Sequence, residues 1–132
     1  MLLIKKVEDL KNRIELINSN EPAVTVSIHQ NSYPDETVKG SQIFYFTHSA
    51  EGKEAAERMQ EEFLAAFPDN TRELKANDTY YLLKKTEVPT IIVECGFLSN
   101  SEETKLLSQD EYQLKLAKTI AKGIESWAVT AG

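Results

Sequence analysis

The sequence is poor in residues that mark several familiar classes of protein. Its single cysteine, Cys95, excludes a disulfide framework within the chain and leaves the redox compartment open. No apolar run reaches the roughly 18 residues of a membrane span, and the opening Met1–Lys6 is too short for a signal peptide. The 15 basic residues are outnumbered by 21 acidic ones, so a nucleic-acid-binding surface is not expected. The sequence also lacks the motifs of phosphate-binding loops and zinc ribbons, and it contains no internal repeat.

What is present predicts one globular domain over residues 1–132, with 41% hydrophobic and 27% charged residues. Helical spacing of apolar residues predicts amphipathic helices, and β-branched runs predict strands between them. The expected helices cover 5–20, 49–67, 99–107 and 110–128; the expected strands cover 23–29, 42–46 and 89–94, with a further extended stretch at 80–83. Alternating helices and strands favour an α/β fold, a mostly parallel sheet flanked by helices.

Two of the expected strands end in an ionisable residue. The run AVTVSIH ends in His29, and the run PTIIVE ends in Glu94. Because ligands of open α/β sheets bind at the carboxyl ends of strands, neighbouring parallel strands would bring imidazole and carboxylate into one crevice. Such a pair suits metal ligation by the histidine and proton transfer by the glutamate. Equally, His29 could be a hydrogen-bonded strand end and Glu94 an ion-paired carboxylate.

Three motifs in this order resemble the zinc-dependent N-acetylmuramoyl-L-alanine amidase family. They are SIHQN at 27–31, KGSQIFYF at 39–46 and, most specifically, PTIIVECGFLSNSEE at 89–103. The resemblance covers nearly the whole chain. It implies an amidase-like fold and hydrolysis, in bacterial peptidoglycan, of the amide between the lactyl group of muramic acid and L-alanine. It also implies a location outside the cytoplasmic membrane, in the cell wall.

The resemblance assigns roles to residues at matching positions. His29 would be a zinc ligand, and Glu94 would be the catalytic carboxylate that takes a proton from the attacking water and returns it to the leaving amine. Asn31, two residues beyond His29, would contact substrate or support the site; it could equally be a turn residue at the strand exit.

The sequence departs from the family in its zinc ligands. A catalytic zinc site generally uses three protein ligands, and the family draws the other two from a DPGHGG-like motif and a following glutamate, neither of which occurs here. The chain therefore resembles an amidase domain lacking the first strand and part of the first helical region. Two hypotheses follow: an impaired or inactive enzyme portion, or a catalytically silent scaffold that binds cell wall or a partner. The uncovered sheet edge favours a homo-oligomer.

Two other reactive residues have simpler explanations. His48 does not correspond to a missing ligand, and it sits where Thr47 or Ser49 can cap a helix, as a surface histidine would. A nucleophilic Cys95 with His29 as its base would make a thiol hydrolase. Because Cys95 follows Glu94 along a strand, its side chain should point to the opposite face, into the core.

Overall fold

The computed structural model describes residues 2–131, and side chains within 5–130. Its helices are α1 (Leu2–Asn20), α2 (Ala50–Ala66), α3 (Tyr81–Lys85), α4 (Ser101–Leu107) and α5 (Asp110–Ala131). Its strands are β1 (Thr25–Asn31), β2 (Gln42–Phe46), β3 (Lys75–Asn77) and β4 (Thr90–Phe97). Within the described residues, no helix combines the length and apolar character needed to cross a bilayer.

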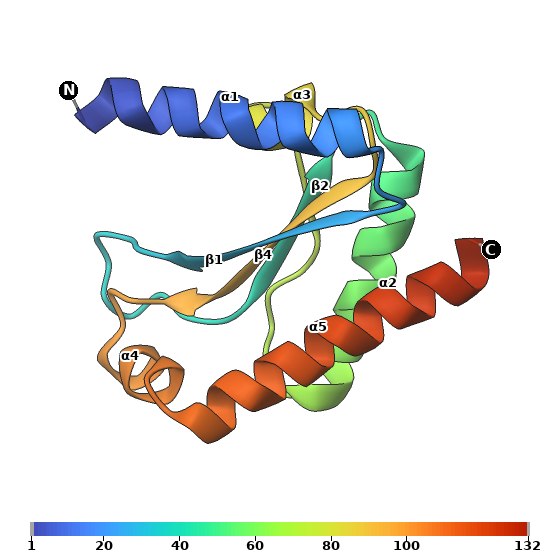
Figure 1. The fold of residues 1–132 in the computed structure, drawn as a ribbon. Helices are drawn as coiled ribbons and strands as arrows, with labels where there is room; N and C mark the ends of the chain where they lie inside the picture. Colours follow the sequence, from blue (N-terminus) through green and yellow to red (C-terminus); the bar gives the residue numbers. More distant parts are fainter. Residues whose placement is uncertain (1, 132) are drawn as a thin grey trace.

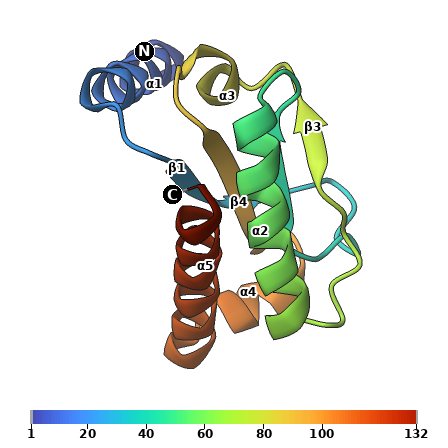
Figure 2. The same ribbon diagram turned by 90° about the vertical axis from the view of Figure 1, so that its right-hand side faces the viewer.

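The strands form one sheet in the order β1-β4-β2-β3. β1 pairs with β4 in parallel and β2 pairs with β3 in parallel, whereas β2 and β4 are antiparallel. The parallel pair β2–β3 is the one joined by a helical crossover, α2. Figure 2 shows β1 at one edge of this sheet and β3 at the other. The predicted α/β fold with a mostly parallel sheet is confirmed.

Helices cover both faces of the sheet. Figure 1 shows α1 above the sheet and α5 below it, with α2 packed beside α5. The larger core lies on the α2 and α5 side and contains Phe63, Met59 and Val93, which are at most 1% exposed. A smaller core on the α1 and α3 side contains Ile14, Leu83 and Ile92. The central strand β4 is therefore buried on both faces, as its continuous apolar run predicts.

The predicted extended stretch at 80–83 is wrong, because the segment begins helix α3. The side-chain oxygen of Asn77 accepts hydrogen bonds from the backbone N–H groups of Thr79 and Tyr80 and so turns the chain. Leu82 and Leu83 then bury themselves in the smaller core. Tertiary burial and this local turn override the strand preference of the tyrosines.

Helix starts follow the predicted caps in part. Ser49 caps α2 by accepting the N–H of Gly52 at 2.9 Å. Asn100 caps α4 by accepting the N–H of Glu103 at 3.0 Å. Glu103 stands three residues after this cap, the spacing of a capping box, but its carboxylate accepts the N–H of Gly40 and not that of the cap residue.

Candidate functional site

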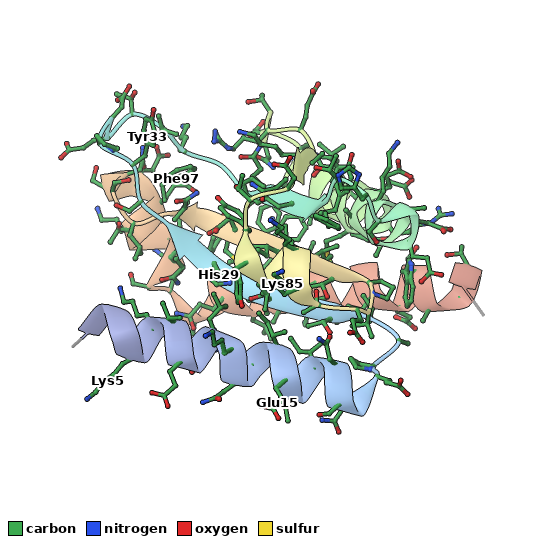
Figure 3. The ribbon with its side chains drawn as sticks, turned by 90° about the horizontal axis from the view of Figure 1, so that it is seen from above. Lys5, Glu15, His29, Tyr33, Lys85 and Phe97 are labelled. Carbon is green, nitrogen blue, oxygen red and sulfur yellow. The ribbon has the colours of Figure 1, made fainter. Side chains whose placement is uncertain are left out.

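His29 and Glu94 lie directly opposite each other on neighbouring parallel strands. The register pairs His29 of β1 with Glu94 of β4, so both side chains leave the sheet on the same face. Figure 3 looks onto this face, where His29 lies on the sheet between α1 and α3. The two strands are thus parallel neighbours, the condition under which imidazole and carboxylate were expected to meet. The expected strand ends at His29 and Glu94 are wrong, because β1 continues to Asn31 and β4 to Phe97. The roles of the two side chains stay predictions.

A bulge follows the pair at once. The next registered residues are Asn31 and Phe97, so β4 uses one residue more than β1 to cover the same distance. A bulge bends the strand that contains it and changes where neighbouring side chains point, and bulges are frequent beside active sites. The regular ladder therefore ends where the two ionisable side chains lie.

Ser27 holds the ring of His29. It lies two residues earlier on the same strand, hence on the same face, and its Oγ is 2.6 Å from Nε2 of His29. A hydrogen bond to one ring nitrogen fixes the orientation of an imidazole and biases its tautomer. Ser27 was not predicted as a site residue from the sequence, although its i, i+2 spacing from His29 along a strand is the pattern that indicates a shared face.

Glu94 is a carboxylate in a half-buried position. Burial raises its pKa above the ordinary value of 4.5, and the neighbouring His29 opposes part of that rise. Its Oε2 is buried and, among the described residues, has no hydrogen-bond partner. On its other side the antiparallel register places Gln42 of β2, whose amide donates to the carbonyl of Glu73. A desolvated carboxylate with one unengaged oxygen suits a proton acceptor.

The remaining candidates lie in different surroundings. Asn31 ends β1, and its Oδ1 accepts the N–H of Ser32 at 2.8 Å, the bond of a turn residue at a strand exit. His48 is exposed and packs its ring edge-on against Phe46, away from the pair.

Cys95 is 4% exposed in the larger core, on the opposite face of β4 from Glu94. Burial raises the pKa of its thiol to about 11, a value that disfavours a thiolate nucleophile.

A groove runs along the free edge of β1 and ends at His29. It has a volume of about 560 Å³ and passes from Leu116 and Ile120 of α5, past Ile28, to His29 and Arg13 of α1. A larger hollow of about 830 Å³ lies between α2 and α5, lined by Tyr112 and Lys115. That hollow is on the far side of the sheet from Glu94. The smaller groove reaches His29 and Arg13, but Glu94 is not among the residues that line it.

His29 and Glu94 do not by themselves fit a catalytic zinc site. Within residues 2–131 no group of three or more histidine, cysteine, aspartate or glutamate side chains could hold a metal ion. A catalytic zinc ion generally takes three protein ligands. The pair therefore offers a proton acceptor and one imidazole donor, which is a portion of such a donor set.

Comparison with known proteins identifies the family of this chain. The N-acetylmuramoyl-L-alanine amidase family (Amidase_3) matches residues 3–126. The germination-specific N-acetylmuramoyl-L-alanine amidase of Bacillus subtilis is 38% identical over 120 residues, which cover 91% of this chain and 51% of that protein. The chain thus spans about half the length of this curated relative.

Solved structures agree with the sequence match. The CwlD amidase of Clostridioides difficile, solved in complex with the GerS lipoprotein, superposes with a TM-score of 0.94 at 38% identity, covering 98% of this chain and 66% of that one. The catalytic domain of CwlV from Bacillus (Paenibacillus) polymyxa var. colistinus gives 0.82 at 27% identity, covering 90% and 65%. The chain belongs to the N-acetylmuramoyl-L-alanine amidase family.

Proposed function

We propose that this chain carries the proton-transfer portion of a peptidoglycan amidase site. The substrate bond is the amide between the lactyl group of N-acetylmuramic acid and L-alanine. The observation that carries the proposal is the register that pairs Glu94 with His29 on neighbouring parallel strands, in a chain of this family. Residues 1–132 would then form part of one amidase catalytic domain, acting outside the cytoplasmic membrane on the cell wall.

Glu94 has the surroundings of a general base. Its raised pKa brings its proton affinity closer to neutral pH, and its buried Oε2 has no hydrogen-bond partner among the described residues that would compete for a proton. In the reaction, Glu94 takes a proton from water as the water oxygen bonds to the lactyl carbonyl carbon. The carbon–nitrogen bond then breaks, and Glu94 returns that proton to the nitrogen of alanine. The products are a lactyl carboxylic acid and a free α-amine.

His29 is proposed as one ligand of a zinc ion. Its place on β1 opposite Glu94 and its ring, held by Ser27, suit that role. Because the described residues do not complete the donor set, we expect this chain alone to bind zinc weakly. Metal analysis of the purified protein at neutral pH should find well under one zinc per chain. A full equivalent retained after dialysis would contradict this expectation.

The experiment that tests the enzyme proposal measures release of α-amines from purified peptidoglycan, with and without added Zn²⁺. We expect slow release from the wild-type chain, none from Glu94→Gln and none from His29→Ala. Glu54→Gln, an exposed glutamate on α2, is the matched control and should behave as wild type. Release by Glu94→Gln equal to wild type would remove Glu94 from the proton-transfer role.

A second candidate function is a silent scaffold that binds the wall without cutting it. The incomplete donor set favours it. Sedimentation with insoluble peptidoglycan, in the absence of any amine release, would identify this function. If the chain neither sediments with peptidoglycan nor releases amines, both functions are excluded for the isolated chain.

Self-association through β1 is proposed for the same chain. β1 lies at the sheet edge, and none of its seven residues is charged or proline. Natural edge strands are usually protected by such residues. Ile28, 60% exposed beside the groove, adds apolar surface at the same edge. A second copy that pairs its own β1 with this strand would give hydrogen-bond partners to the edge N–H and C=O groups. It would also bury the side chain of Ile28.

A further inference from the structure

The loop that follows His29 is bound to the segment that follows Glu94. This loop, Ser32–Ser41, connects β1 to β2, and Figure 1 shows it running beside the end of β4 and the start of α4. Hydrogen bonds join the two segments along their length: Leu98 N–H to Asn31 O (2.7 Å), Tyr33 N–H to Ser99 Oγ (2.9 Å), Asn100 Nδ2 to Glu36 O (3.0 Å) and Ser41 Oγ to Cys95 O (3.0 Å).

A buried carboxylate lies at the centre of these contacts. Glu103 is only 7% exposed, and its Oε1 accepts the N–H of Gly40 at 2.5 Å and, more weakly, that of Phe97 at 3.4 Å. Gly96 leaves the room for this side chain, since a Cβ there would lie 2.6 Å from Oε2 of Glu103. Gly40 has a φ of +109°, a conformation that side chains disfavour. Both glycines therefore fit the contact with Glu103.

Burial of the Glu103 carboxylate is unfavourable unless hydrogen bonds compensate for the lost hydration. An ionised carboxylate loses hydration on burial, and hydrogen bonds from backbone N–H groups offset that loss. A glutamate at this place in α4 would ordinarily bond back to its own helix cap. Here it reaches the other side of the connection, and Asn100 alone caps the helix. The buried carboxylate of Glu103 thus joins the two segments.

The contacts begin where the β1–β4 ladder becomes irregular. The bulge ends the regular pairing directly beyond His29 and Glu94, the residues whose spacing matters for the site. We propose that Glu103 is a positioning residue: it holds the loop Ser32–Ser41 against the end of β4 and thereby fixes how His29 and Glu94 face each other. The catalytic meaning of this role rests on the proposed function, whereas the structural effect can be measured without it.

The test compares Glu103→Ala and Glu103→Gln with the control Glu102→Gln. Glu102 is the adjacent glutamate, and its contact with the loop is a solvent-exposed ion pair with Lys39 at 3.6 Å. Hydrogen exchange followed by mass spectrometry reports on the loop. In Glu103→Ala we expect amides of residues 32–41 to exchange about tenfold faster or more, while those of α2 and α5 keep their wild-type rates. Glu103→Gln keeps an acceptor oxygen for Gly40 and should recover part of the protection.

A second readout follows the site itself. The chain has two histidines, so the ring resonance of His29 can be followed by NMR with His48 as an internal reference. We expect the His29 resonance to shift in Glu103→Ala and not in Glu102→Gln, with the His48 resonance unchanged. Unchanged loop exchange, an equal acceleration in every element, or an unmoved His29 resonance would each overturn the proposal.

Turnover separates this proposal from the proposed function. If the wild-type chain releases amines from peptidoglycan, Glu103→Ala should lower kcat more than it raises KM, and Glu103→Gln should restore part of kcat. If the wild-type chain releases none, the enzyme proposal fails, but exchange and NMR still decide whether Glu103 positions the loop and His29.

Discussion

The hydroxyl of Ser27 and Nε2 of His29 lie 2.6 Å apart on the same face of β1. This contact leaves Nδ1 as the ring nitrogen not engaged by Ser27. We expect Ser27→Ala to release the ring, changing the tautomer populations seen in imidazole ¹⁵N spectra, and to weaken any zinc binding by about tenfold or more. Ser27→Thr keeps the hydroxyl and serves as the control. Identical ¹⁵N spectra for wild type and Ser27→Ala would show that the hydroxyl does not orient His29.

The ionised side chain of Glu94 should lower the free energy of unfolding at neutral pH. Its folded-state pKa is raised, so its favourable contribution is complete below about pH 4.5 and is lost as pH rises through the folded pKa. Glu94→Gln lacks this titration and should exceed wild type at pH 7 by about 1 kcal/mol in the free energy of unfolding. The difference should shrink towards pH 4. Urea denaturation of both proteins at the two pH values measures it, and a less stable Glu94→Gln at pH 7 would contradict the expectation.

Cys95 should be inert in the folded chain. Burial, with a smaller contribution from the Glu94 charge, raises its pKa from 9.0 to about 11. At pH 8 this shift alone lowers the thiolate population about a hundredfold, and burial slows access further. An aromatic disulfide reagent should therefore label the native protein at least that much more slowly than the urea-unfolded protein. Cys95→Ala should keep any amine release, since loss of release with an intact fold would revive the thiol mechanism.

The free edge of β1 should make the protein self-associate. Multi-angle light scattering after size exclusion should show a dimer or larger species for wild type. Ile28→Lys places a charge on this edge and should shift the population to monomer without lowering helix content. Leu64→Lys, at an exposed leucine on α2, is the matched control and should remain associated. A monomeric wild type at high concentration would refute self-association through β1.

Local patterns predicted the two chemically important positions and their neighbourhood. Apolar β-branched runs were enough to place His29 and Glu94 in strands, although β1 continues to Asn31 and β4 to Phe97, and the motifs around them indicated the family. The i, i+1 alternation of a strand likewise predicted that Cys95 faces the core, opposite Glu94. These features depend on residues close together in the chain, which is why sequence periodicity carries them.

Contacts between residues far apart in the chain could not be predicted from such local patterns. The antiparallel pairing of β2 with β4, which sets Gln42 beside Glu94, depends on how the whole sheet assembles. Glu103 carried the spacing of a capping-box residue, yet its carboxylate bonds to Gly40, which is 63 residues earlier. At Tyr80 and Tyr81 strand preference gave way to burial of the leucines that follow. In each case a long-range contact outweighed a local preference.

The pairing of β1 with β4 also bears on how the chain folds. β1 and β4 are separated in sequence by β2, α2, β3 and α3, so their ladder closes a long loop of chain. Closure of long loops costs entropy before any contact repays it, and parallel pairings between distant strands form slowly. The local helices α2 and α5 have no such requirement. The ladder that aligns His29 with Glu94 should therefore be among the last parts to form as the chain folds, so partly folded chains would carry the helices before they carry the site.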